Sequence, residues 1–216
     1  IPTDSRLSCG LQCRAARGAG AGLTVRPLAR LWEDPALLAV HREHLADQFR
    51  AGEAGAAAAD GVLLIVLHGT LLADKAGRPP AFHTGEQEKA RYADALRDAL
   101  EAMPVRPWER VEVAYLNHAV GGRWSQPAFE DRLGQLAAEG VQALWVYPAE
   151  HLVESAETAR IAVTLADAPL QHSRLLPCLN DSPLLIDYLA ARVRDAVSRG
   201  TGQPCGHCTL ETPPHS

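Results

Sequence analysis

Four short apolar runs, each followed by a segment with helical spacing, are the feature that most constrains the fold of this chain. The runs are GVLLIVL (61–67), RVEVAYLN (110–117), VQALWVYP (141–148) and RLLPCLN (174–180). The first is continuously apolar, which is typical of a strand covered on both faces. Strands that alternate with helices favour parallel pairing. We therefore predict an α/β fold, a doubly wound, mostly parallel four-stranded sheet with helices on both faces.

The predicted helices have recognisable ends. Thr84 and Gln87 have the spacing of a capping box, which predicts a helix from there to Met103. Ser182 and Pro183 form an N-cap and a first-turn proline for the last helix. The remaining helices are expected at 35–52, 127–139 and 154–165.

The 216 residues, 47% of them hydrophobic, suffice for one α/β domain. We assign that domain to residues 24–200. Residues 1–23 have no hydrophobic period and are rich in Gly, Ala and Arg, so we expect them to be disordered or loosely packed. Residues 201–216 form a polar, cysteine-containing tail.

Charge and composition exclude several classes of function. The net charge is −5 and Lys and Arg are scattered, which argues against a nucleic acid partner, since phosphate binding needs a basic face. No segment approaches the roughly 20 apolar residues of a membrane span. We find no signal peptide and expect a cytoplasmic protein. Five cysteines, an odd number, speak against a disulfide framework.

Candidate site residues follow the predicted strands, because parallel α/β sheets bind ligands outside the carboxyl ends of their strands. No GxGxxG, GxxxxGK[ST] or GxSxG motif is present, so dinucleotide, P-loop and serine-hydrolase functions have no support. The residues at the strand ends are His68, Gly69, Asn117, His118, Trp124, Glu150, His151, Asn180 and Asp181.

An imidazole facing a carboxylate can bind a borderline divalent metal or move protons near neutral pH. Glu154 and Glu157 have i,i+3 spacing, so both are expected on one side of a helix near its N-terminus. A structural role for His68 and a solvated helix face for the glutamates are the alternatives. Trp124 suits a packing lid or a substrate contact equally.

His41 and His44 also have helical i,i+3 spacing. That spacing allows a metal pair, but the polar edge of an amphipathic helix is the favoured interpretation.

Four motifs together resemble the ferrochelatases: HG at 68–69, WSQP at 124–127, PAEHLVESAET at 148–158 and PCLNDSP at 177–183. The resemblance runs from about Val25 to about Val197. It implies a metal-inserting lyase of haem biosynthesis, which inserts ferrous iron into a porphyrin, protoporphyrin IX or coproporphyrin III. By motif, His68 and Glu157 correspond to the family's catalytic and metal-handling pair, which faces across the porphyrin cleft. Trp124 is then a substrate-binding residue.

The chain departs from the family pattern in three ways. It reads HGTL where the family has HG-x-P, and Ile161 stands where an acidic residue commonly follows Glu157 by four positions. Ferrochelatases also have two similar lobes, and only the second is resembled. Together with the start at Ile1, this predicts an incomplete chain, whose partner is a missing N-terminal lobe or a second subunit.

Some ferrochelatases hold a [2Fe–2S] cluster through cysteines. Cys205 and Cys208, in CGHC, can contribute to such a cluster, or to a zinc site with Cys9 and Cys13; a free CxxC is favoured.

Two other functions stay open. The first is a sirohydrochlorin-type chelatase, which PCLNDSP opposes. The second is a non-catalytic remnant that binds porphyrin or haem, which the missing lobe favours and the joint presence of His68 and Glu157 opposes.

Overall fold

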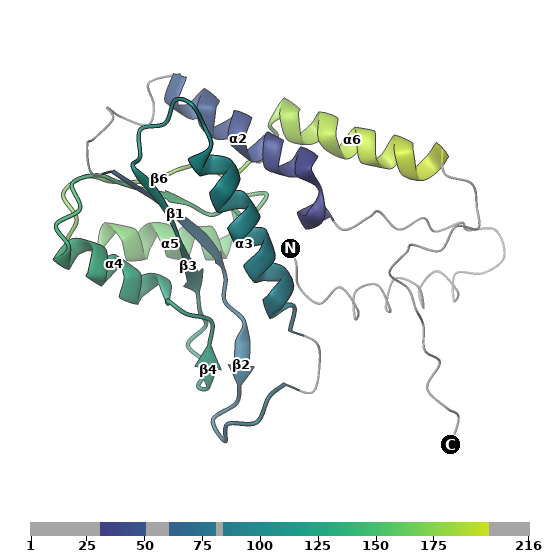
Figure 1. Cartoon of the computed structure of the whole chain (residues 1–216). Coiled ribbons are helices and arrows are strands. Elements are labelled where there is room, and N and C mark those ends of the chain that lie inside the picture. The colour runs from purple at the N-terminus through teal and green to yellow at the C-terminus, as the bar shows by residue number, and fades with distance from the viewer. Residues whose placement is uncertain (1–30, 51–60, 81–83, 199–216) are drawn as a thin grey trace, which may run out of the picture.

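The structure is a computed structural model that describes residues 31–50, 61–80 and 84–198. Four strands form a parallel sheet in the order β3-β1-β5-β6, and Figure 1 shows helices on both sides of it. This confirms the predicted α/β class and the parallel four-stranded sheet. The elements, in chain order, are η1 (Leu31–Glu33), α2 (Pro35–Arg50), β1 (Val62–His68), β2 (Leu71–Ala73), α3 (Glu86–Glu101), β3 (Arg110–Leu116), β4 (Arg123–Trp124), α4 (Phe129–Ala138), β5 (Leu144–Tyr147), α5 (Ala156–Ala166), β6 (Ser173–Leu175) and α6 (Pro183–Ser198).

The central strand β1 divides the core into two layers, because successive side chains of a strand point to opposite faces. Its even-numbered residues Val62, Leu64 and Val66 belong to a cluster with residues of α4 and α5. Its odd-numbered residues belong to a second cluster, with residues of α2 and α3. The continuous apolar run is therefore explained by helices on both faces.

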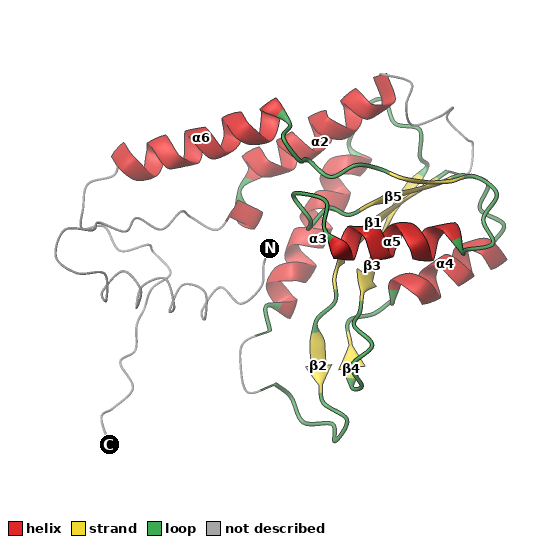
Figure 2. Cartoon of the chain, turned by 180° about the vertical axis from the view of Figure 1, so that it is seen from behind, coloured by secondary structure: helices red, strands yellow, loops and turns green. Residues whose placement is uncertain are grey.

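Helix α6 joins the domain through α2, beside which it lies in both views (Figures 1 and 2). Leu37 and Val40 of α2 form a third buried cluster with Leu179, Leu185 and Tyr188. Among the described residues, we find no helix whose length and apolar character would let it cross a bilayer.

The structure adds a feature that the sequence did not predict. Strands β2 and β4 pair antiparallel as a small ribbon that extends beyond the ends of β1 and β3 (Figure 2). Gly122, at φ 138°, brings the two strands close, since a Cβ there would lie 2.4 Å from the Ala73 carbonyl oxygen. The ribbon has strands of three and two residues, too short for a periodic pattern in the sequence.

The expected capping box of α3 is wrong. Gly85, at φ 70°, is the N-cap of α3, and no side chain caps the helix there. A glycine adopts this left-handed conformation without the strain that a side chain would bring. The proposed segments 1–23 and 201–216, with four of the five cysteines, lie outside the described residues.

Candidate functional site

His68 and Glu157 meet at the carboxyl edge of the sheet. His68 is the last residue of β1 and continues its even-numbered series, so its side chain points toward the α4/α5 layer. Glu157 lies in the first turn of α5. The His68 Nε2 and Glu157 Oε1 atoms are 3.1 Å apart. The two residues singled out from the sequence are therefore in direct contact.

His118 completes a cluster with this pair. It follows β3 by two residues, and its Nε2 lies 2.9 Å from His68 Nε2 and 3.6 Å from Glu157 Oε1. The three side chains are 26–39% exposed, so solvent reaches the cluster. Two imidazoles and a carboxylate, each offering one atom within 4.8 Å of the others, form a group that can hold a metal ion.

The close approach of β1 and β3 explains why a glycine, Gly69, follows His68. The Gly69 N–H donates to the Leu116 carbonyl at 2.9 Å, and a Cβ at this position would lie 2.0 Å from Asn117 Oδ1. Any side chain would therefore separate the ends of β1 and β3. Because those ends present His68 and His118, glycine at position 69 preserves their contact.

A buried ion pair holds the backbone of His68 from the other side of the sheet. Glu150 accepts the His68 backbone N–H at 2.8 Å, and Lys89 of α3 donates to the His68 carbonyl. Lys89 Nζ and Glu150 Oε2 are 3.7 Å apart, and both side chains are buried. Burial lowers the pKa of Lys89, against the opposing charges of Glu150 and Glu157. The pair fixes the peptide groups from which the imidazole projects.

The N-terminus of α5 separates the two glutamates that were expected on one side of a helix. Ser155 is the N-cap, in a capping box with Thr158, and the helix begins at Ala156. Glu154 therefore precedes the helix, and its Oε1 accepts the Cys178 N–H at 3.1 Å. The prediction that Glu154 and Glu157 share a side is wrong: Glu154 binds the PCLNDSP turn.

Trp124, on β4, lies at the rim of the cluster. Its ring centroid is 5.6 Å from that of His118, and its indole N–H donates to the Val120 carbonyl at 2.8 Å. It thus packs against a site residue, and its predicted substrate contact stays a proposal.

His41 and His44 are buried, so neither the metal pair nor the polar edge describes them. The Nδ1 and Nε2 atoms of His41 lie 2.6 Å from the Tyr147 hydroxyl and 3.1 Å from the Tyr92 hydroxyl, respectively. His44 Nε2 lies 3.0 Å from the Pro177 carbonyl oxygen. Both histidines serve as hydrogen-bonding core residues.

His151 lies beside the cluster, next to Glu157. Its Nδ1 lies 3.6 Å from Glu157 Oε2, and its side chain is 10% exposed. Burial lowers the pKa of His151, although the charges of Glu157 and Glu150 act in the opposite direction. The sequence placed His118 and His151 at strand ends without assigning them a role. Their positions after predicted strands were the only indication in the sequence that His118 and His151 lie near the site.

A parallel α/β sheet with imidazoles and a carboxylate at its carboxyl edge defines an α/β protein whose edge carries side chains of the kind that can bind a divalent metal. Within that class, the chain belongs to the ferrochelatase family, whose sequence model matches residues 1–197.

Three curated ferrochelatases resemble parts of the chain. That of Synechocystis sp. is 31% identical over 108 residues, which are 48% of this chain and 26% of the relative. That of Opitutus terrae is 34% identical over 91 residues, 40% of this chain and 26% of the relative. That of Ectopseudomonas mendocina is 34% identical over 107 residues, 46% of this chain and 30% of the relative. The chain thus spans between a quarter and a third of the length of these relatives.

The contact between His68 and Glu157 corrects one expectation. The resemblance implied that the two residues face each other across a porphyrin. A flat macrocycle between them would need about 7 Å, two van der Waals contacts, whereas the two side chains are 3.1 Å apart. The two side chains therefore leave no space for a ring between them.

Proposed function

We propose that this chain carries the metal-insertion point of a ferrochelatase-type enzyme, which inserts Fe²⁺ into protoporphyrin IX or coproporphyrin III. The observation that carries the proposal is the 3.1 Å contact between His68 Nε2 and Glu157 Oε1, which lie in the HG and PAEHLVESAET motifs. Family membership supports the reaction class.

The reaction needs both a ligand and a base. Two pyrrole N–H protons leave the macrocycle as one Fe²⁺ enters, so the two positive charges brought by the metal are balanced by two protons that must reach acceptors. We assign the role of anionic ligand to Glu157, because the positive end of the α5 dipole stabilises its carboxylate. His68 ligates iron through a neutral imidazole nitrogen and accepts a proton through the same atom once the iron has left.

The macrocycle would lie over the cluster on one side only. His68 and Glu157 then deliver the metal and receive protons at a single face of the ring. Trp124, at the rim, offers an apolar ring to the macrocycle. The opposite face of the ring is left open to a second wall, which we assign to a further lobe or subunit.

Anaerobic metallation assays test this proposal. The chain is mixed with Fe²⁺ or Zn²⁺ and each porphyrin, and the change in porphyrin absorbance is followed. We expect turnover in the wild type and a fall to the uncatalysed rate in His68→Ala and Glu157→Gln. His172→Ala, which removes an exposed imidazole outside the cluster, is the matched control and should leave the rate unchanged.

Two outcomes would contradict the proposal. Porphyrin binding without turnover in the wild type would indicate a non-catalytic macrocycle-binding protein. Metallation of sirohydrochlorin but of neither porphyrin would indicate a chelatase for a different ring.

A further inference from the structure

We propose that His118 is a third protein ligand, so that His68, His118 and Glu157 form a ready-made site that holds a divalent cation before any macrocycle arrives. The inference rests on the proposed function for the choice of Fe²⁺ as the natural ion. The test of metal binding needs no porphyrin, so its result can contradict this inference without contradicting the proposed function, and the reverse.

The distances within the cluster match one face of a coordination polyhedron. The three ligand atoms form a triangle with sides of 2.9, 3.1 and 3.6 Å. Ligands about 2.1 Å from a metal are roughly 3.4 Å apart in a tetrahedron and roughly 3.0 Å apart in an octahedron. The circle through the three atoms has a radius of about 1.9 Å, so one ion about 1 Å above their plane reaches all three at bonding distance.

The ligand types select the ion. Two imidazole nitrogens with one carboxylate oxygen suit Fe²⁺, Zn²⁺ and Co²⁺ better than Mg²⁺ or Ca²⁺, which prefer oxygen ligands. Three protein ligands leave further positions for water or for incoming pyrrole nitrogens. The partial exposure of all three side chains keeps those positions accessible to solvent.

Hydrogen bonds of Asn117, the residue between β3 and His118, hold His118 where it can act as a metal ligand. Asn117 Nδ2 donates to the Ser125 carbonyl at 3.0 Å, and Arg160 of α5 donates to the Asn117 carbonyl. The Trp124 ring lies against the His118 imidazole on the ribbon side. His118 is thereby held toward α5, the helix that carries Glu157.

The cluster also has a proton that a metal would displace. With the two Nε2 atoms 2.9 Å apart, one ring nitrogen must carry a hydrogen and the other accept it. A metal ion at the triangle takes both lone pairs once that hydrogen moves to the Nδ1 side. The second oxygen of Glu157 faces His151 at 3.6 Å, which leaves Oε1 for the ion.

Metal binding by the full chain tests the inference. All variants carry serine at Cys9, Cys13, Cys205 and Cys208, because thiolates also bind these ions. Zn²⁺ affinity is measured by competition with a chromophoric chelator, and Co²⁺ absorption reports the ligand set. We expect one site, with affinity at least about tenfold weaker in His118→Ala, since even outer-shell partners of a metal act on that scale. His172→Ala should bind as the parent does.

Circular dichroism melting curves establish that each variant is folded. Equal Zn²⁺ affinity in the parent and in His118→Ala would overturn the inference, as would the absence of metal binding by the parent. Weaker binding in His118→Ala together with absent porphyrin metallation would support the third ligand and contradict the proposed function.

Discussion

At the residue scale, a chain of buried hydrogen bonds supports the loop that carries Glu150 and His151. The Tyr92 hydroxyl donates to the Ala149 carbonyl at 3.2 Å, so it accepts from Nε2–H of His41. The other nitrogen of His41 then accepts from the Tyr147 hydroxyl at 2.6 Å. This pattern of donors and acceptors requires a neutral His41 imidazole, because a protonated ring would have no nitrogen left to accept from the Tyr147 hydroxyl.

This arrangement predicts a dependence of stability on pH. Burial, and to a lesser extent the charge of His44, lower the pKa of His41 from 6.5 to about 3. Between those values the unfolded chain binds a proton at His41 that the native state excludes. The free energy of unfolding should therefore fall as the pH drops below 6.5, by at most about 1.4 kcal/mol per pH unit from this group.

The measurement is urea unfolding of the wild type and of His41→Gln from pH 7.5 to pH 4.5. His41→Gln should be less stable at pH 7.5 and should lose stability less steeply on acidification. Equal slopes for the two proteins would show that His41 is not the titrating group. His172→Ala, with its imidazole exposed, should keep the wild-type slope.

The sequence predicts those site residues that stand at strand ends and within motifs. His68 and Glu157 were found in this way, and their contact is observed. Lys89 was missed, because a lysine within a helix has no pattern that separates a buried position from a solvated one. Its burial depends on Glu150, a residue 61 positions later, so only the tertiary structure reveals it.

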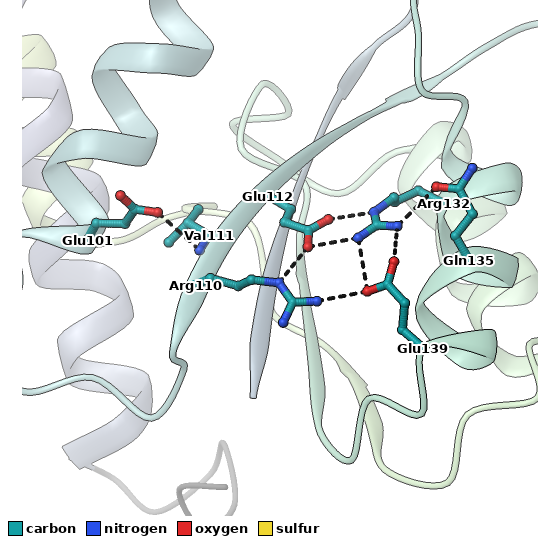
Figure 3. Close-up of polar contacts among 7 residues, drawn as sticks. All are labelled: Glu101, Arg110, Val111, Glu112, Arg132, Gln135 and Glu139. Carbon is teal, nitrogen blue, oxygen red and sulfur yellow. Dashed lines mark hydrogen bonds and ion pairs between the residues drawn. The ribbon is translucent and has the colours of Figure 1, made fainter. Parts of the chain in front are cut away.

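At the scale of elements, a charged network joins the edge strand β3 to α4. Glu112 of β3 accepts hydrogen bonds from Arg110 at 2.7 Å and from Arg132 of α4 at 2.5 and 2.8 Å (Figure 3). Glu139, just beyond α4, accepts from the same two arginines. The network connects the strand that precedes His118 to the helix that covers it.

Replacing Glu112 with Gln should lower the free energy of unfolding by about 1–2 kcal/mol at neutral pH, because charge-assisted hydrogen bonds are lost at a partly exposed site. Burial raises the pKa of Glu112, but hydrogen bonds from Arg132 and Arg110 outweigh it, and the net pKa lies below 4.5. The stabilisation is therefore complete above pH 4.5 and is lost as the pH falls through the lowered value.

Chemical unfolding at pH 7 and pH 3 measures this effect. The difference between wild type and Glu112→Gln should shrink at pH 3. Glu109→Gln, at an exposed position just before β3, is the control and should change stability little at either pH. A difference as large at pH 3 as at pH 7 would contradict the role of the carboxylate.

The boundaries of elements were predicted less well than their order. The third strand was expected over 141–148, and β5 covers only Leu144–Tyr147. A helix was expected from Glu154, but the Ser155 cap delays α5 to Ala156 and directs Glu154 elsewhere. Apolar periodicity indicates that a helix exists, whereas one hydrogen-bonding side chain decides where it begins.

At the scale of the whole molecule, strand ends and a helix start that lie far apart in the sequence contribute to the one cluster for which we propose metal binding. A metal that binds only the native state stabilises the entire fold by mass action. In the cysteine-to-serine background, Zn²⁺ at 100 times its dissociation constant should add about 2.7 kcal/mol. That corresponds to a rise in melting temperature of roughly 5–10 °C for a chain of this size.

Differential scanning calorimetry with and without Zn²⁺ measures this rise, and removal of the metal with a chelator should reverse it. Glu157→Gln should show a much smaller rise, since it lacks the anionic ligand. An equal rise in Glu157→Gln would locate the stabilising ion at another place in the molecule.

The pairing of β1 with neighbours on both edges has a consequence for how this lobe tolerates insertions and deletions. β1 pairs with β3 along its whole length, from Val62 opposite Arg110 to His68 opposite Leu116. Losing one residue within β1, with the neighbouring strands unchanged, would turn the imidazole toward Lys89 and the α2/α3 layer. Insertions and deletions should therefore be tolerated in the loops at the outer end of the β2–β4 ribbon. Within β1 they should be strongly selected against.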